Sequence, residues 1–343
     1  MRCHCSIIPN DVLKRFAEDE KLSAPERKNF ADTALVDTEM RKLRLQAGKL
    51  TNVTAALSRA PVATVATPAI TVADCNHSQT LPGAPVANPG SSADLTIKRA
   101  YDETKAVAEF YKTVFGRNSI DNAGMTLGSS VHYGVNYNNA FWNGMRMTYG
   151  DGDANIFIDF TKSNDVIGHE LTHGVTQHTL QLAYSNQAGG LNESISDVFG
   201  TMFRQWRAGQ TVNQADWLIG SEIMGPGAIA RHFTCLRDMA SPGAAHCLAP
   251  QPFHFSNYHA GMDPHYSSGI ANFAFYKIAM AVGGQSWEKV GQIWYKAMTG
   301  FKPSVNMRMK TFADRTRKLA VSMYPGNVAL QRAVNAGWIA VGL

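Results

Sequence analysis

The chain has 343 residues, of which 45% are hydrophobic and 17% are charged. This composition is typical of folded globular proteins and unlike that of disordered or coiled-coil chains. The length exceeds the usual size of a single hydrophobic core, so we expect two lobes that share a cleft. The 32 Lys and Arg residues exceed the 27 Asp and Glu residues by only five and are scattered along the chain. This balance argues against a nucleic-acid partner.

Neither a membrane span nor an export signal is expected. No apolar run approaches the roughly 20 residues that cross a bilayer, and the first 20 residues are too polar for a secretory signal. We therefore expect cytoplasmic synthesis, with release by a non-classical route as the alternative.

The five cysteines form no obvious disulfide framework. A pairing of Cys235 with Cys247 stays open, and free thiols are the default expectation. The run Cys3-His4-Cys5 is interpreted as a frayed terminus and not as a metal site.

In chain order, the first predicted unit is helical and small. Residues 8–46 have helical character, with Asn10 or Asp11 as the expected cap. From about residue 49 to 90 the composition changes to Val, Thr, Ala, Pro and Gly, which predicts short strands and turns. A unit boundary is therefore expected near residues 45–50.

The rest of the chain divides into a strand-rich part and a helical part. Residues 96–115 have amphipathic helical spacing that ends at Gly116. Residues 129–160 alternate aromatic and β-branched residues with Asn and Gly turns, which predicts antiparallel strands. After Asp165 helical periodicity dominates, over 165–180, 191–208, 268–282, 286–299, 306–323 and 327–337.

The segment His169-Glu170-Leu-Thr-His173 is a candidate metal motif. Residues four apart share one face of a helix, so both imidazoles can reach one zinc ion, while Glu170 can reach a water on that ion. The motif also occurs by chance in ordinary helices, and a catalytic zinc needs a third protein ligand. Glu193 meets that need, because it lies twenty residues beyond His173 at the start of a second amphipathic helix.

Two further polar residues of that second helix are candidates to orient the histidines. Asp197 lies four residues after Glu193, and Asn192 lies directly before it. Zinc-bound imidazoles normally donate their second N–H to a carboxylate or carbonyl oxygen, which fixes the ring. The alternative is a helix cap and a solvated acid.

Several blocks between residues 81 and 343 resemble the thermolysin family of neutral zinc metalloproteases. They include FGRNSID, VHYGVNYNNAFWNG, HELTHGVT, GGLNESISDVFGTM and DPHYSSGIANFAFY. The resemblance implies an α+β, two-lobed, thermolysin-like zincin with a β-rich N-terminal lobe (48–164), a helical C-terminal lobe (165–343) and the active-site helix between them. The implied activity is zinc-dependent hydrolysis of internal peptide bonds in proteins or peptides.

The resemblance also implies roles for individual residues. Asp197 would pair with His169 and Asn192 with His173. Tyr184 and His265 would stabilise the oxyanion, with Asp263 orienting His265. The implied substrate-binding residues are Asn139 and Ala140 for the backbone, Arg237 for a carbonyl group, and Phe157, Val166 and Leu236 for an apolar side chain just after the scissile bond.

The segment CSIIPNDVLKRFAED resembles the short propeptide of protealysin-like members, with Asn10 in place of a second proline. We therefore expect residues 1–47 to be a propeptide that inhibits its own chain, in a zymogen that is monomeric. The alternative is a non-catalytic zincin-fold module that binds peptides, and the presence of Glu170, Tyr184 and His265 favours the enzyme.

The family's double-calcium site is expected to be absent. The chain keeps Asp165 and Asp216 but has Arg204, Leu218 and Ser221 at other acidic positions. Two carboxylates cannot offset the repulsion of two neighbouring calcium ions. We expect Arg204 to bridge Asp165 and Asp216 instead, the alternative being that Arg204 points to solvent.

Overall fold

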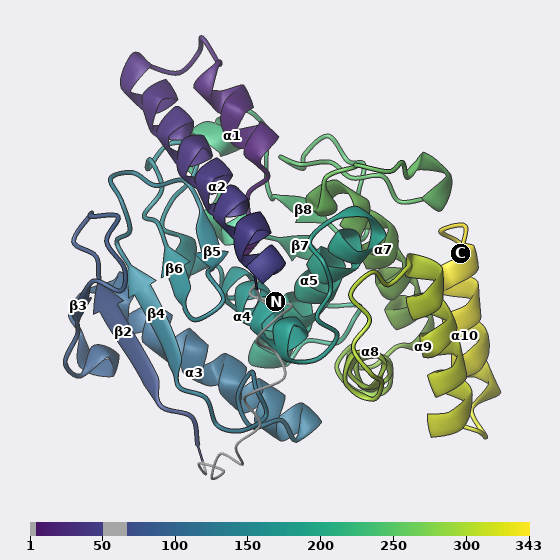
Figure 1. Ribbon diagram of the computed structural model, residues 1–343. Coiled ribbons are helices and arrows are strands. Elements are labelled where there is room, and N and C mark those ends of the chain that lie inside the picture. The colour runs from purple at the N-terminus through teal and green to yellow at the C-terminus, as the bar shows by residue number, and fades with distance from the viewer. Residues whose placement is uncertain (1–4, 51–66) are drawn as a thin grey trace.

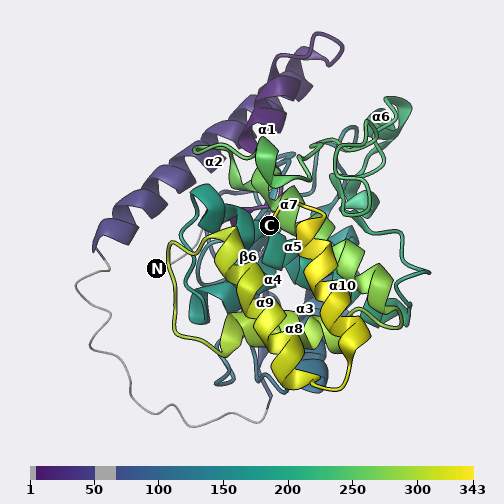
Figure 2. The same ribbon diagram turned by 90° about the vertical axis from the view of Figure 1, so that its right-hand side faces the viewer.

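The computed structural model describes residues 5–50 and 67–343, without the side chains of residues 41 and 43–50. The chain begins with β1 (Cys5–Ser6), α1 (Asn10–Ala17) and α2 (Ala24–Leu50). Helices α1 and α2 pack together at the top of Figure 1, and α2 lies across the outside of the molecule in Figure 2. The predicted helical N-terminal unit is therefore present.

The predicted cap of α1 is wrong. Pro9 holds the cap position, and the helix begins at Asn10 without a side-chain cap. The Asn10 side chain instead donates to Ala34 O at 2.9 Å and to Asp37 Oδ2 at 3.0 Å. Asn10 therefore joins α1 to α2.

The N-terminal lobe is built on a six-stranded sheet of order β1-β5-β6-β4-β2-β3. Its other strands are β2 (Ile70–Asp74), β3 (Ala84–Pro85), β4 (Leu127–Val131), β5 (Ala140–Trp142) and β6 (Met147–Tyr149). The edge strand β1 comes from the N-terminal unit and pairs antiparallel with β5, with Cys5 opposite Trp142 and Ser6 opposite Phe141. A strand of the first unit thus completes the sheet of the lobe that follows.

The expectation of antiparallel strands is correct for β5 and β6 but wrong for β4. Strand β4 runs parallel to both β2 and β6. Helix α3 (Leu95–Phe115) lies between β2 and β4 in the chain and packs on both, which returns the chain to the same end of the sheet. The helix has the predicted end, since Gly116 caps it at a φ of 67°.

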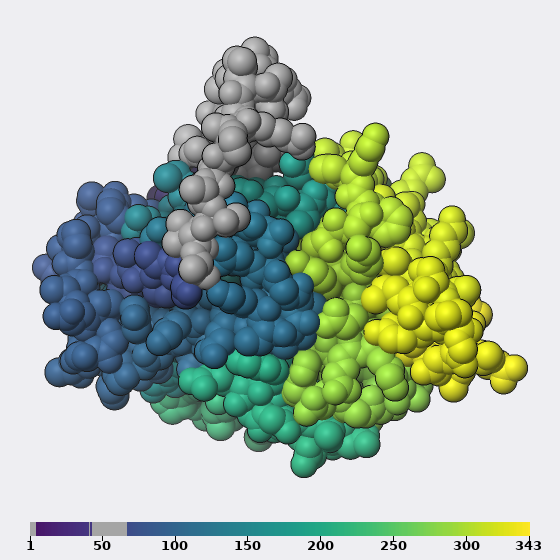
Figure 3. Space-filling model, turned by 90° about the horizontal axis from the view of Figure 1, so that it is seen from below, coloured from purple at the N-terminus to yellow at the C-terminus, as the bar shows by residue number. Residues whose placement is uncertain are grey.

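The C-terminal half is helical, as predicted, and lies beside the blue N-terminal lobe in Figure 3. Its long helices are α4 (Asn164–His178), α5 (Asn186–Ala208), α7 (Pro264–Val282), α8 (Lys289–Thr299), α9 (Met309–Met323) and α10 (Val328–Ile339). Its short elements are β7 (Leu218–Ile219), α6 (Pro226–Ala230), β8 (Arg237–Asp238) and 3₁₀ turns at Ser221–Ile223 and Phe255–Asn257. The N-terminal lobe has 3₁₀ turns at Pro89–Ser91 and Phe160–Lys162. No helix in the described ranges is long and apolar enough to cross a membrane.

Helices α4 and α5 form the buried centre of the molecule, with every residue from 165 to 176 buried. Two glycines permit their close approach. A Cβ at Gly200 would lie 2.5 Å from Asp165 O, and one at Gly168 would lie 3.1 Å from the Gly200 Cα. Since ordinary side chains do not reach such distances, small residues at this crossing bring α5 against the metal-binding face of α4.

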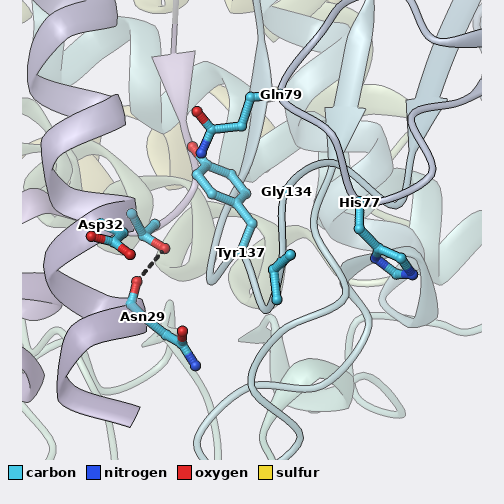
Figure 4. Close-up of a pocket in the computed structure, with 8 residues that line it drawn as sticks. Asn29, Asp32, His77, Gln79, Gly134 and Tyr137 are labelled. Carbon is cyan, nitrogen blue, oxygen red and sulfur yellow. Dashed lines mark hydrogen bonds between the residues drawn. The ribbon is translucent and has the colours of Figure 1, made fainter. Parts of the chain in front are cut away.

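Helix α2 packs over the loops that follow β2 and β4. The Asn138 N–H donates to Thr33 Oγ1 at 3.2 Å. Beside this contact, α2 and the loops carrying Gln79 and Tyr137 enclose a pocket of about 270 Å³ (Figure 4). The N-terminal unit is thus docked on the N-terminal lobe at more than one place.

Candidate metal centre and active site

The two histidines of the sequence motif lie one turn apart on α4, and both are fully buried. The His169 Nδ1 donates to Asp197 Oδ1 at 2.8 Å, and the His173 Nδ1 donates to Asn192 Oδ1 at 3.0 Å. These are the pairings that the family resemblance implied. Because each Nδ1 is engaged, each Nε2 is left to face the space between α4 and α5.

Glu193 on α5 closes that space on the third side. The two Nε2 atoms are 3.0 Å apart, and each lies 3.4 Å from a different carboxylate oxygen of Glu193. Three ligands of a tetrahedral zinc with bonds of about 2.0–2.1 Å lie roughly 3.3 Å from one another. The three side chains therefore form a triangle of the size that zinc requires.

Glu170 is fully buried beside this triangle. Its Oε2 accepts the Trp142 backbone N–H at 3.0 Å, and its Oε1 has no hydrogen-bond partner within the described ranges. Burial raises the pKa of Glu170 well above its usual value, and the charge of Glu193 acts in the same direction, against the opposing effect of His169. A raised pKa makes a carboxylate a stronger base than an ordinary glutamate, which suits a group that takes up a proton and returns it.

Tyr184 and His265 lie next to Glu193. The Tyr184 hydroxyl hydrogen-bonds Glu193 and lies 3.2 Å from His265 Nε2. Asp263 caps α7, and its Oδ1 lies 2.6 Å from His265 Nδ1. The Ser6 carbonyl oxygen lies 2.6 Å from His265 Nε2. Since Asp263 and Ser6 O both accept, each ring nitrogen of His265 donates.

The implied substrate-binding residues contact the N-terminal segment of the same chain. The Ile7 N–H donates to Ala140 O at 3.1 Å, and the Ile8 N–H donates to Asn139 Oδ1 at 3.0 Å. Arg237 donates to the Ile7 carbonyl at 3.1 Å. Ser6 at the end of β1 and the bend that follows it, Ile7 and Ile8, therefore run through the site.

The three residues implied to line the apolar pocket, Phe157, Val166 and Leu236, are fully buried. Aromatic rings of the N-terminal unit pack on the first of them. The Phe157 ring centroid lies 6.5 Å from that of Phe16 and 6.2 Å from that of Phe30.

Arg204 lies between the two carboxylates, as predicted. Its guanidinium is 3.6 Å from Asp165 Oδ2 and 3.2 Å from Asp216 Oδ2, and it also donates to Leu218 O and Ser221 Oγ at 3.2 Å each. Its side chain is only 20% exposed. The alternative of a solvent-directed arginine is therefore wrong.

Comparisons with known proteins assign the chain to one family. Residues 66–177 match the catalytic-domain model of thermolysin metallopeptidases, and residues 180–343 match the α-helical-domain model of the same peptidases. The chain belongs to the thermolysin family of metallopeptidases. It is thus a zinc-dependent peptidase with the expected α+β fold of two lobes.

Relatives within the thermolysin family include an extracellular metalloprotease of Pectobacterium carotovorum subsp. carotovorum, which is 42% identical over 79% of this chain and 80% of its own length. Protease PrtS of a Photorhabdus species is 39% identical over 79% of this chain and 75% of its own length. Among solved structures, the precursor of protealysin from Serratia proteamaculans superposes with a TM-score of 0.83 at 36% identity, covering 98% of this chain and 99% of that one. The superposition therefore includes the N-terminal unit, and the matching structure is that of a precursor.

The residues present fit the zinc ion that the thermolysin family implies. Two neutral imidazoles and a carboxylate are the donor set of a catalytic zinc with an open position. Glu193 Oε2, like Glu170 Oε1, is buried without a hydrogen-bond partner in the described part of the chain. Burying a carboxylate oxygen without a hydrogen-bond partner costs free energy of folding unless a cation lies next to it.

Three contacts at the site were not predicted from the sequence. The Trp142 N–H holds Glu170, the Ser196 hydroxyl lies 3.0 Å from His173 Nδ1, and Asn272 donates to Asp197 at 2.8 Å. The spacing of four between Asn192 and Ser196 was an available signal for the second contact. Asn272 offered none, because α7 is brought to α5 only by the tertiary fold.

The interpretation of the first residues as a frayed terminus is wrong at Cys5, while Cys3 and His4 lie outside the described residues. Cys5 is fully buried, and its sulfur lies within 4.8 Å of ligand atoms of His173 and Glu193. Cys5 is also disulfide-bonded, so the expectation of free thiols fails there, whereas it holds for Cys75, Cys235 and Cys247.

Proposed function

We propose that this peptidase is made as a zymogen and hydrolyses internal peptide bonds on the N-terminal side of hydrophobic residues. Residues 1–47 would be the propeptide, followed by the lobes 48–164 and 165–343. One observation carries the proposal: the side chains expected to hold a substrate backbone are hydrogen-bonded to residues 6–8 of the same chain. In this proposal the site binds peptide, and the N-terminal segment of the same chain closes it.

The direction of the segment supports action on internal bonds. Strand β1 pairs with β5, and the chain continues through Ile7 and Ile8 into α1. Peptide therefore lies on both sides of the Ser6–Ile7 bond, as an endopeptidase requires. An aminopeptidase would need a carboxylate that binds a free N-terminus, and Asn139 and Ala140 hold backbone groups instead.

Each catalytic group has a defined task. Zinc, when bound, polarises the carbonyl group under attack and lowers the pKa of water. Glu170 accepts a proton from the attacking water and returns it to the leaving nitrogen. Tyr184 and His265 donate hydrogen bonds to the developing oxyanion, and Asp263 orients the His265 ring.

The apolar preference rests on three buried residues that belong to the same hydrophobic cluster as Ile7. Phe157, Val166 and Leu236 present no charge, so a charged side chain there would be desolvated without a partner. Ile7 follows the carbonyl that His265 contacts, which is the position after the scissile bond in a substrate. An apolar residue at this position of the N-terminal segment agrees with the proposed preference.

We further propose that the guanidinium of Arg204 takes the place of the double-calcium site. One fixed positive charge balances the buried carboxylate of Asp165 and the half-exposed carboxylate of Asp216. Stability would then depend little on calcium at this site.

The variant Glu170→Gln tests the enzyme against the alternative of a non-catalytic peptide-binding module. We expect kcat/KM on an internally quenched peptide to fall by about 10²–10⁴-fold when the N-terminal segment has been removed from both proteins, because only the proton carrier is then lost. Zinc content, measured by plasma mass spectrometry, should stay equal to that of the parent. Glu109→Gln, at an exposed position on α3, is the matched control and should retain full turnover. Absence of turnover in the processed parent would assign the chain to the non-catalytic class, and full turnover in Glu170→Gln would remove Glu170 from the mechanism.

A further inference from the structure

A second group of metal-ligating side chains lies away from the catalytic centre, next to β8. Cys235 lies just before β8, and Cys247 lies after it. The backbones of these two cysteines pair in an isolated parallel β-bridge. The Leu248 N–H donates to Cys235 O at 2.9 Å, and the Thr234 N–H donates to His246 O at 3.0 Å. One ligand atom each from Cys235, His246 and Cys247 lies within 4.8 Å of the other two.

The sulfur separation matches a shared metal ion and not a disulfide. The two Sγ atoms are 3.8 Å apart, and both cysteines are free and buried. A disulfide would require about 2.05 Å. Two thiolates on one tetrahedral zinc, each bonded at about 2.3 Å, lie roughly 3.8 Å apart.

His246 is held by a carboxylate, as metal-ligating histidines usually are. Its Nε2 lies 3.1 Å from Asp238 Oδ2. The other oxygen of Asp238 accepts the backbone N–H groups of Ala240 and Ser241 at 2.7 and 3.1 Å, so the carboxylate is fixed in place. A carboxylate that holds one imidazole nitrogen sets the tautomer and leaves Nδ1 unprotonated for a cation.

We propose that Cys235, His246 and Cys247 bind a second zinc ion. Two thiolates and an imidazole are a soft donor set that suits zinc and not calcium or magnesium. Water would complete the coordination, since the His246 side chain is 38% exposed while both sulfurs are buried.

The position of the cluster indicates what the ion does. Between Cys235 and Cys247 the chain carries Leu236 of the apolar pocket and Arg237, whose guanidinium binds Asp197 at 2.8 and 3.0 Å. An ion that joins the two ends of this loop fixes the backbone on which Arg237 stands. Its contribution is therefore to the stability of the substrate-binding side and not to the chemical step.

Metal counting in the Glu170→Gln background, which cannot digest itself, tests the proposal. After saturation with zinc and removal of the excess, the full chain should hold two zinc ions. The double variant Cys235→Ser/Cys247→Ser should hold one. Cys75→Ser, which removes a buried thiol elsewhere, should keep two. Cobalt substitution should give a thiolate-to-cobalt absorption that the double variant loses.

A second variant covers the case in which the double variant does not fold. His246→Ala alters a half-exposed ring and removes a ligand. It should weaken binding of the second zinc by more than the about 10- to 100-fold that loss of a ligand's hydrogen-bond partner costs, as judged by competition with a chelator of known affinity. One zinc ion in the parent, or unchanged affinity in His246→Ala, overturns the proposal.

Counting free thiols tests whether Cys235 and Cys247 form a disulfide instead of binding zinc. The denatured, unreduced parent should take up two more alkylating groups than the double variant. Equal uptake would mean that Cys235 and Cys247 form a disulfide in solution, which also overturns the proposal.

Discussion

Glu193 illustrates how far single residues could be assigned from the sequence. Its distance from the His169 motif, together with the helical pattern around it, predicted a third ligand, and both carboxylate oxygens face the histidines. The contact that holds Glu170 could not be predicted, because its donor is the backbone N–H of Trp142. Backbone donors have no signature in the amino-acid sequence, so only the fold reveals them.

At the residue scale, Tyr184→Phe separates oxyanion stabilisation from metal binding. The variant keeps the ring and loses the hydroxyl, which lies between Glu193 and His265. We expect kcat of the processed enzyme to fall by about 10²-fold, with KM nearly unchanged, since the lost donor acts on the transition state. Steady-state kinetics with parallel zinc analysis would measure this. A loss of zinc in the variant would assign Tyr184 to the metal site instead.

Elements with a strong local signal were predicted well, and those defined by distant partners were not. Helix α4 has continuous helical periodicity and appeared within two residues of its predicted bounds. Helix α5 begins at Asn186, five residues before the prediction, because its first turns contain Gly189 and Gly190, which pack against Pro264 and Ser267. The parallel pairing of β4 depends on the path of α3, which no pattern within a five-residue strand specifies.

The link between α5 and the β7 turn gives a prediction at the element scale. Arg204→Ala leaves the buried carboxylate of Asp165 without its cation. We expect a loss of about 1–3 kcal/mol in the free energy of unfolding, from denaturant titration in the Glu170→Gln background. Arg207→Ala on the same helix breaks an exposed pair with Glu103 and should cost less than about 1 kcal/mol.

The effect of calcium on stability is a second test of the role of Arg204. Added calcium should not restore the stability of Arg204→Ala, and a calcium chelator that spares zinc should not destabilise the parent. Strong destabilisation of the parent on calcium removal would contradict the replacement of calcium by Arg204.

The contact between α3 and the loop after β4 predicts a pH dependence. Hydrogen bonding to Asp151 raises the pKa of His132 to about 9, against the effect of burial and with help from Asp94, the cap of α3. A pKa above the ordinary value of about 6.5 stabilises the fold fully below pH 6.5, and the effect is lost as pH rises through about 9. His132→Asn, which tolerates the φ of 51° at this position, removes the imidazole.

Melting temperatures in the Glu170→Gln background would measure that dependence. The difference between parent and His132→Asn should be largest near about pH 6 and shrink towards about pH 10. A difference that stays constant across this range would show that the ion pairs with Asp94 and Asp151 do not stabilise the fold.

At the scale of the whole molecule, the N-terminal unit joins the two lobes. Strand β1 extends the sheet of one lobe, while Arg15 donates to Leu248 O in the other at 2.8 Å and Arg231 pairs with Asp19. Sequence resemblance predicted a propeptide but not its path. That path depends on buried contacts between residues far apart in the chain, such as Ser6 with Asp37 at 2.8 Å.

Shortening of the purified wild-type chain, followed by intact-mass spectrometry together with peptide turnover, tests the central claim most directly. We predict conversion to a form that starts between residues 40 and 55. Turnover should rise in proportion to that form and extrapolate to nearly zero for the full-length chain, because residues 6–8 are hydrogen-bonded to the side chains that we propose hold the substrate. Glu170→Gln alone should stay full length. Full turnover by the unshortened chain, or equal shortening of Glu170→Gln, would contradict a peptidase that is held inactive by, and removes, its own N-terminal segment.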